Sequence, residues 1–228
     1  MPKTDANWET LWQDRDILTR WQQPNQDVTE LLQVLHHHQC RRILDLGFGI
    51  GRHIVYFAQS GFEVYGVEET KSGITFCDQW LKQLGLDAIL ARGDMSNIMT
   101  LFKTNFFDFV LCWNVIYHAR FEKIVETIAG IRQVLRENGL LYITFNSTNN
   151  RYCGQGTEIE SGTFIGAKEK KDGDHIHHYS DKEEVCRLLE GFDLIMMVER
   201  EEQVGVQIFP DTYHWYVLAQ RLPDNRAC

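Results

Sequence analysis

The residues best suited to chemistry in this chain are three alternating glycines that follow an acidic residue. Gly47, Gly49 and Gly51 come directly after an apolar run that contains Asp45 and ends at Leu46. The run predicts a buried strand, and a helical pattern follows the last glycine. A strand, a glycine turn and a helix N-terminus together favour a nucleotide-like ligand, because glycine lets a ligand approach the backbone closely.

The spacing of this segment distinguishes between nucleotide ligands. The dinucleotide fingerprint is G-x-G-x-x-G, and Arg52 stands where its third glycine would be. The phosphate-loop pattern G-x-x-x-x-G-K-[ST] does not occur in the sequence. A carboxylate at Asp45 would repel a pyrophosphate, but it suits a ligand that carries an ammonium and a sulfonium group.

The run from Leu44 to Gly51 resembles motif I of the class I S-adenosylmethionine (SAM)-dependent methyltransferases. The family pattern is close to V-L-D-L-G-C-G-x-G, and Phe48 replaces the common cysteine or small residue. The resemblance implies that SAM is the cofactor. It also implies a set of contacts to SAM in this segment, made by Asp45, Gly47, Phe48, Gly49 and Gly51.

Two further segments resemble family motifs in the expected order. Gly66-Val67-Glu68 resembles motif II, in which an acid at the end of the second strand accepts hydrogen bonds from both ribose hydroxyls. Glu69 is the alternative for that role. After the third strand, the resemblance implies that Asp94 accepts from the exocyclic amine of adenine and that the backbone N–H of Met95 donates to a ring nitrogen.

The strand over residues 107–113 resembles motif IV of the family. The resemblance implies that Trp113 and Asn114 emerge beside the methionine part of the cofactor, and that Tyr117 and His118 line the acceptor side. A turn at Asn138 and Gly139 resembles the family's turn into the fifth strand, and this pair is also favourable turn chemistry in its own right.

The remaining acceptor-side candidates come from the last third of the chain. We expect Tyr152 to close over the methyl group and Trp215 to contact the acceptor. His177 and His178 adjoin the start of a predicted helix, whose dipole lowers a histidine pKa and favours the neutral form that a general base needs. His177 and His178 are therefore the expected catalytic bases, and Tyr152 is the third catalytic candidate. The alternative for the two histidines is a solvated or helix-capping role. The neighbouring candidates in these segments are His175, His214 and Tyr216.

A metal site is a rival use of the polar insert. Asp172, Asp174, His175, His177 and His178 lie within seven residues, and His175 and His177 would share one face of a strand. No complete ligand set stands at a familiar spacing, so we expect no metal. The tryptophans Trp8, Trp12 and Trp21 are expected to anchor an N-terminal helix by packing rather than to contact a ligand.

The regular pattern of the chain alternates strands with helices. Strands are expected at residues 43–46, 62–68, 88–91, 106–113, 140–146, 192–201 and 214–219, and helices at 6–20, 27–35, 51–60, 72–84, 120–136 and 181–190. Such alternation predicts a parallel sheet covered on both faces, with ligands outside the carboxyl ends of the strands. The resemblance implies a Rossmann-like, doubly wound α/β fold with seven strands and an antiparallel C-terminal strand.

Residues 1–228 are expected to form one domain with two additions. Residues 1–38 form a helical cover, and residues 147–179, which are too long for an ordinary loop, form a substrate-side insert or lid with a small hairpin near 163–167. The six cysteines are scattered without C-x-x-C spacing, which predicts reduced thiols and a cytoplasmic location. No leader or membrane-spanning run is evident.

The charge of the chain separates the possible acceptors. The formal net charge of −9 disfavours nucleic acid as a partner, since nonspecific phosphate binders usually carry a basic face. We therefore expect methyl transfer from SAM to a small molecule, in a monomer or homodimer. The alternatives are a non-catalytic SAM-binding sensor or partner subunit, and a methyltransferase that acts on protein or RNA. Arg52 disfavours a nicotinamide dehydrogenase.

Overall fold

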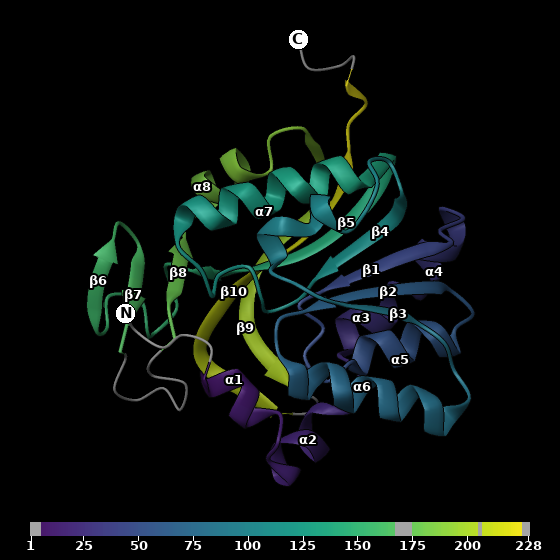
Figure 1. Cartoon of the computed structure of the whole chain (residues 1–228). Helices are drawn as coiled ribbons and strands as arrows, with labels where there is room; N and C mark the ends of the chain where they lie inside the picture. The colour runs from purple at the N-terminus through teal and green to yellow at the C-terminus, as the bar shows by residue number, and fades with distance from the viewer. Residues whose placement is uncertain (1–5, 167–174, 205–206, 225–228) are drawn as a thin grey trace.

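Five parallel strands form the centre of the sheet, in the order β3-β2-β1-β4-β5 (Figure 1). The structure is a computed structural model that describes residues 6–166, 175–204 and 207–224. The parallel strands are β1 (Arg42–Leu46), β2 (Glu63–Glu68), β3 (Ile89–Arg92), β4 (Phe107–Cys112) and β5 (Leu135–Ser147). The chain builds outward from β1 to β3 and then returns to β4 on the other side of β1. This reversal creates a crevice at the carboxyl ends of β1 and β4, where ligands of such sheets bind.

Two long C-terminal strands complete the expected seven. β10 (Gln207–Arg221) pairs antiparallel with β5 on one side and with β9 (Phe192–Val204) on the other. The Rossmann-like sheet with an antiparallel C-terminal strand is therefore confirmed. Alternate residues of β10 point to opposite faces, which matters for the site because only one of the two faces meets the crevice.

The insert contributes three strands, which the sequence pattern did not predict in full. β8 (His177–Ser180) pairs in parallel with the carboxyl end of β5, and the hairpin of β6 (Thr157–Glu160) and β7 (Thr163–Ile165) extends the sheet beyond it. The hairpin turns at Gly162, whose φ of +72° suits a tight turn, and so lies earlier than the expected 163–167. Residues 167–174, with Asp172 and Asp174, lie outside the described residues.

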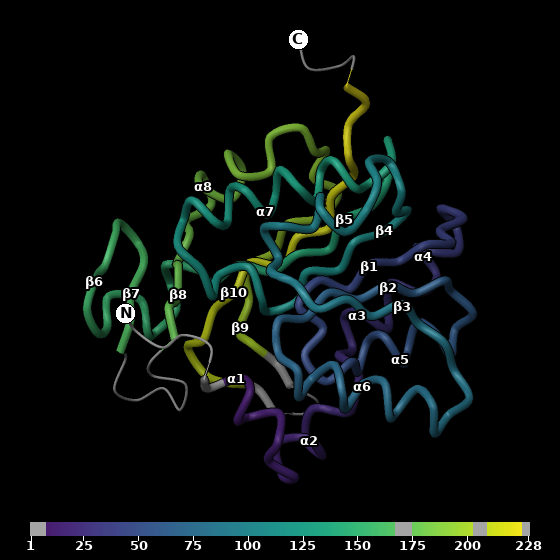
Figure 2. Tube along the Cα trace, in the orientation of Figure 1, coloured from purple at the N-terminus to yellow at the C-terminus, as the bar shows by residue number. Residues whose placement is uncertain are grey.

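Helices cover both faces of the sheet (Figures 1 and 2). On one face, α7 and α8 pack with the short 3-10 helix η1 on a core that includes Leu44 and Val110. On the other, α3 to α6 pack on Ile43 and Phe109. Their bounds are α3 (Gln26–Glu30), α4 (Leu32–His37), α5 (Arg52–Gln59), α6 (Lys71–Leu84), η1 (Met95–Thr100), α7 (Phe121–Val134) and α8 (Lys182–Leu188).

The N-terminal helix expected over residues 6–20 is two helices, α1 (Ala6–Leu11) and α2 (Arg15–Trp21). Asp14 interrupts the pattern because its carboxylate caps α2, accepting from the backbone N–H groups of Asp16 at 2.9 Å and Ile17 at 3.2 Å. The next expected helix is likewise split at Leu31. In the middle of the chain, α7 ends at Val134 and not at Arg136, and the Asn138 turn falls within β5.

Candidate cofactor and acceptor site

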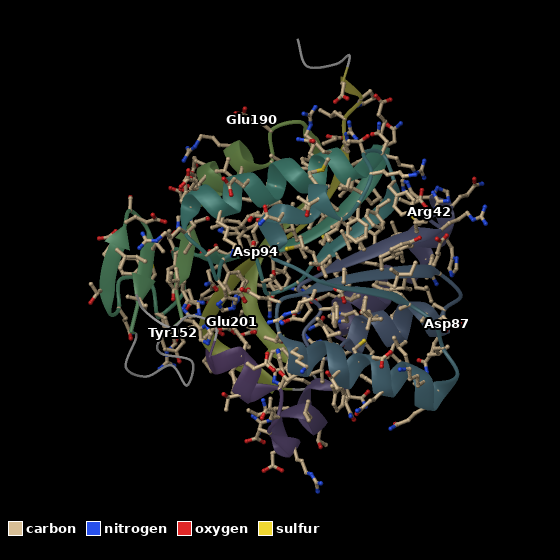
Figure 3. All side chains as sticks on the ribbon, viewed as in Figure 1. Arg42, Asp87, Asp94, Tyr152, Glu190 and Glu201 are labelled. Atoms are coloured by element: carbon tan, nitrogen blue, oxygen red, sulfur yellow. The ribbon has the colours of Figure 1, made fainter. Side chains whose placement is uncertain are left out.

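A cavity of about 1080 Å³ opens at the carboxyl ends of β1, β2, β3 and β4. Figure 3 shows Asp94, which follows β3, near the middle of the molecule, whereas Arg42 and Asp87 lie at the amino ends of their strands at the far side. α1, α2 and β10 also contribute lining residues. The cavity therefore occupies the position that the sheet topology predicts for a ligand.

The glycine loop after β1 brings the backbone to the cavity wall. Gly47 and Gly49 have φ values of +73° and +57°, and both line the cavity. A Cβ added to Gly47 would lie 2.5 Å from a methyl carbon of Val115, and one added to Gly49 would lie 3.1 Å from the Trp12 ring. Side chains on this loop would thus collide with the segments that close over it. Phe48 also lines the cavity, as expected.

Gly51 lies against α6 rather than in the cavity lining. It is not among the residues that line the cavity, and a Cβ there would lie 2.2 Å from the sulfur of Cys77 on α6. Its left-handed φ of +86° starts α5 directly against α6. The third glycine therefore permits helix packing, and its expected contact to the cofactor stays a prediction.

Asp45 places a buried carboxyl group beside the glycine loop. The residue is 2% exposed and lines the cavity, and its Oδ2 has no hydrogen-bond partner among the described residues. Burial raises its pKa to about 8, an effect that Arg52 opposes and Glu68 reinforces. A buried carboxyl atom without a partner is a site for a cationic ligand group, which is what an amino acid ammonium would supply.

Glu68 connects the end of β2 to the glycine loop. Its Oε2 accepts from the Gly49 backbone N–H at 2.9 Å, and its Oε1 accepts from the N–H of Thr70 at 2.9 Å and its hydroxyl at 2.7 Å. Burial raises its pKa, and these hydrogen bonds oppose the shift. Glu68 thus shapes the loop as well as facing the cavity, which Glu69 lines beside it. The ribose role remains a prediction for both acids.

Asp94 and Met95 lie where the adenine end of the ligand is expected. Both line the cavity, and Oδ1 of Asp94 accepts from the backbone N–H and the hydroxyl of Ser96 at 2.9 Å each. Oδ2 of Asp94 pairs with Lys123 of α7. Burial acts to raise the pKa of Asp94, but the hydrogen bonds from Lys123 and Ser96 outweigh it and the pKa is lowered. A carboxylate fixed in its ionised form can accept from an amine.

The turn after β4 forms the wall between the two ends of the cavity. Trp113 and Asn114 line it as expected, with the Trp113 ring stacked 5.6 Å from Tyr142. Asn114 has a φ of +54°, and its backbone N–H donates to the Thr144 hydroxyl at 2.7 Å. Its side-chain amide donates to Glu202 of β9 at 3.1 Å. These bonds fix the turn against β5 and β9.

Three of the predicted acceptor-side residues reach the cavity. Tyr117, His118 and Tyr152 all line it, and the two neighbouring candidates His175 and His214 line it as well. The centroid of the His118 ring lies 4.6 Å from that of Tyr117 and 4.7 Å from that of His177. The structure therefore places imidazole and phenol groups at one end of the cavity.

The structure does not bring His177, His178 and Trp215 to the cavity lining, so it gives their expected catalytic and acceptor-binding roles no support. His178 is buried between the Thr163 hydroxyl and the Glu184 carboxylate, each 2.7 Å from a ring nitrogen. His177 lies behind His118, with its Nδ1 3.1 Å from the carbonyl oxygen of His175. Trp215 faces the α7 side of the sheet, where its indole N–H donates to the Ser180 carbonyl at 3.0 Å.

A helical cover was expected at residues 1–38, but sequence reasoning missed that its tryptophans line the cavity. Trp8, Trp12 and Trp21 were expected to serve in packing, yet all three line the cavity. α1 is held in place by Glu9, whose carboxylate accepts from the backbone N–H groups of Lys71 and Ser72 at the start of α6, both at 2.8 Å. The signal in the sequence was the density of tryptophan on short segments without a regular helical period.

Arg52 and His53 tie the same cover to α5. The Arg52 guanidinium lies 4.7 Å from the Trp21 ring centroid. Nε2 of His53 accepts from the Asn25 backbone N–H at 3.2 Å, and burial holds the pKa of His53 well below its ordinary value. A neutral imidazole is the form that can accept this bond.

Comparisons with known proteins agree with this geometry. Residues 43–139 match the family model described as a methyltransferase domain. The glycine loop and Glu68 lie within the matched stretch, so the cofactor end of the cavity belongs to the part of the chain that is similar to a methyltransferase domain. YqeM of Bacillus subtilis (strain 168), a methyltransferase by name, is 28% identical to the chain over 108 residues, which are 47% of this chain and 43% of YqeM. The match thus spans less than half the length of that relative.

Solved structures share the fold of the methyltransferase domain. A SAM-dependent methyltransferase from Methanosarcina mazei has a TM-score of 0.68 at 19% identity, and the match covers 83% of this chain and 97% of that one. The 1,6-didemethyltoxoflavin-N1-methyltransferase of Burkholderia thailandensis has a TM-score of 0.66 at 18% identity, covering 96% and 87%. That structure contains bound 1,6-didemethyltoxoflavin and S-adenosylhomocysteine.

The residues of the cavity fit SAM. The orphaned Oδ2 of Asp45 suits its ammonium, and the backbone of Gly47 and Gly49 forms part of the cavity wall beside it. Within residues 6–166, 175–204 and 207–224, no three His, Cys, Asp or Glu side chains are grouped so as to hold a metal ion. None of the helices that the structure describes is long and apolar enough to cross a membrane.

Proposed function

We propose that this methyltransferase domain transfers the methyl group of SAM to a small-molecule acceptor by in-line displacement. The observation that carries the proposal is a continuous cavity with two chemically different ends. Sites for one drug-sized ligand measure about 300–1,000 Å³. The cavity here is about 1080 Å³, just above that range, and its lining extends from the glycine loop to the rings of Tyr117, His118 and His214.

Methyl transfer from SAM requires the protein mainly to align the acceptor atom with the methyl group and to exclude water. SAM supplies an electrophilic methyl group on a sulfonium, whose thioether leaves readily. The chain must hold the acceptor atom in line with it. Trp8 of α1 and Trp12, the residue after α1, line the cavity, and aromatic faces also favour a positive sulfur.

His118 is the residue best placed to remove a proton from the acceptor. It follows Val115, which contacts Gly47 of the cofactor loop, and its backbone N–H donates to the Val115 carbonyl at 3.0 Å. The turn is also held from behind, because the His178 N–H donates to the Tyr117 carbonyl at 2.8 Å. An N–H or O–H acceptor would give its proton to the imidazole as its electron pair attacks the methyl carbon.

The net charge of the chain and the N-terminal helices over the cavity favour a small-molecule acceptor over a macromolecular one. The net charge of −9 opposes a phosphate backbone, and the N-terminal helices cover the cavity and narrow access to it. A protein or RNA acceptor is thus less compatible with this geometry than a metabolite that fits inside.

Two measurements test the proposal. Isothermal titration should show binding of SAM and S-adenosylhomocysteine, and SAM labelled in its methyl group should then be incubated with the protein and a cell extract. We expect label in the small-molecule fraction. Label in the protein or RNA fraction would reassign the acceptor, and binding without any transfer would favour a SAM sensor or partner subunit.

A further inference from the structure

Five rings that line the cavity form a continuous row, which we call the ring row. Neighbouring ring centroids lie 5.5, 5.3, 4.6 and 5.5 Å apart along the row. The members, in order, are Trp12, Trp8, His118, Tyr117 and His214, and all of them line the cavity. They come from α1 and the residue after it, from the turn after β4 and from β10, so folding brings three distant segments to one wall.

The ring row lies apart from the two hydrophobic core clusters. In the described part of the chain, neither of the two hydrophobic core clusters includes any of its five members. Trp12, Tyr117 and His214 are buried and reach the cavity with a small part of their surface, whereas Trp8 and His118 are half-buried. Aromatic rings that line a cavity without filling a core offer flat faces to a ligand, and such faces favour stacking or edge contacts with another ring.

The row also has a flanking ring on each side. The His175 ring centroid lies 4.9 Å from that of Trp8, and Tyr152 lines the cavity from the insert. The backbone N–H of Tyr152 donates to the Asn150 side chain at 3.1 Å, and the Asn150 amide donates to the Tyr213 carbonyl at 3.2 Å. The insert is therefore fixed against β10 next to the row.

The charges around the cavity oppose an anionic acceptor. The described lining includes eight carboxyl side chains and four cationic ones. These cationic side chains already have partners in the protein. Lys123 forms an ion pair with Asp94, and Arg120 forms one with Glu160. The Arg92 Nε donates to the Glu69 carbonyl at 2.9 Å. Arg52 is attracted by Asp45 and Glu202. A negatively charged acceptor would thus meet excess negative charge.

We propose that the methyl acceptor is a flat aromatic or heteroaromatic molecule without negative charge, bound against the ring row. This inference rests on the proposed function, since it names the class of molecule that occupies the second end of the cavity. Trp8 is the central contact, because it joins the α1 cover to His118 and His175.

The test uses three probes with one carbon skeleton and the full chain saturated with S-adenosylhomocysteine. 2-Naphthol is flat and neutral, decahydro-2-naphthol is neutral but not aromatic, and 2-naphthoate is flat but anionic. Isothermal titration should show 2-naphthol binding at least about tenfold more tightly than either of the others, a difference of about 1.4 kcal/mol. Equal affinity for the naphthol and its saturated form would overturn the inference, as would no naphthol binding at millimolar concentration.

Matched variants assign the preference to the ring row. Trp8→Leu should remove the preference for 2-naphthol, and Trp8→Phe, which keeps a flat ring, should retain most of it. Trp80→Leu is the control, since Trp80 packs against Phe76 on α6 and is not part of the cavity lining. A Trp8→Leu protein with an unchanged preference would contradict the assignment.

Binding of S-adenosylhomocysteine, measured first on the same sample, separates the two proposals. A protein that does not bind it contradicts the proposed methyltransferase function. A protein that binds it but shows no preference for the flat neutral probe contradicts only the aromatic acceptor.

Discussion

Asp45→Asn should alter the pH dependence of stability in a way that can be worked from the structure. The carboxyl is 2% exposed, and its burial raises the pKa from 3.8 to about 8. Between these two values the folded state holds a proton that the unfolded chain has lost, so the free energy of unfolding falls as the pH rises. One pH unit corresponds to about 1.4 kcal/mol, so three units between pH 5 and pH 8 amount to at most about 4 kcal/mol.

Asparagine has nearly the same shape but does not titrate. The free energy of unfolding of Asp45→Asn and of the wild type is measured with urea at several pH values. The value for Asp45→Asn minus the value for the wild type should increase by up to about 4 kcal/mol from pH 5 to pH 8. Asp78→Asn, which removes an exposed carboxylate paired with Lys82, controls for the loss of one charge. A difference between Asp45→Asn and wild type that stays constant with pH would refute the protonated carboxyl.

As the pH rises, Asp45→Asn should gain stability relative to the wild type but should bind the cofactor more weakly than the wild type does. The SAM ammonium favours ionised Asp45, so the affinity of the wild type for SAM should increase as the pH rises toward 8, by at most about tenfold per unit. Asp45→Asn should bind SAM more weakly at pH 8, and the difference should shrink at pH 6, where the wild-type carboxyl is protonated. Isothermal titration at the two pH values measures both effects.

The other predictions concern the loop and the acceptor end. Gly49→Val should abolish SAM binding, because Gly49 has a φ of +57° and the new side chain would press on Trp12. Gly85 has a φ of +64° with open space around it, so Gly85→Val should lower the stability of the fold but keep the affinity for SAM. An equal loss of SAM affinity in both variants would contradict the close approach of the ligand to Gly49. Glu68→Ala should weaken SAM binding more than tenfold by releasing the Gly49 N–H, with Glu68→Gln intermediate; wild-type affinity in the alanine variant would remove Glu68 from the site. His118→Gln should lower methyl transfer to the small-molecule fraction about 100-fold without weakening S-adenosylhomocysteine binding, and unchanged transfer would exclude it as the base.

The centre of the fold could be predicted because its signals are local. The apolar run before Gly47 forms β1, and the acid at the end of the next strand, Glu68, lies beside that loop. Strand order and the carboxyl-end site follow from the alternation of strands and helices, which requires parallel pairing and crossover connections. The cofactor end therefore depends on short stretches of sequence and on a topology that they imply.

The acceptor end depends on contacts that no local pattern contains. Trp215 and His214 differ by one position on β10, and the register with β5 decides which of them meets the cavity. His178 was a reasonable base by its helix-adjacent position, but pairing of β8 with β7 turns it toward Thr163. Trp8 reaches the cavity through the Glu9 cap on α6, a contact across 62 residues of chain.

The division of the cavity between stretches of the chain has an evolutionary consequence. The stretch that matches the methyltransferase family model, residues 43–139, carries the glycine loop and Glu68, whereas Trp8, Tyr152 and His214 lie outside it. Lineages can preserve the central stretch under selection for the methyl donor while the flanks diverge toward new metabolites. A chimeric protein that combines the central stretch of one such protein with the flanking segments of another would then have the acceptor preference of the second protein and keep the methyl-donor recognition of the first.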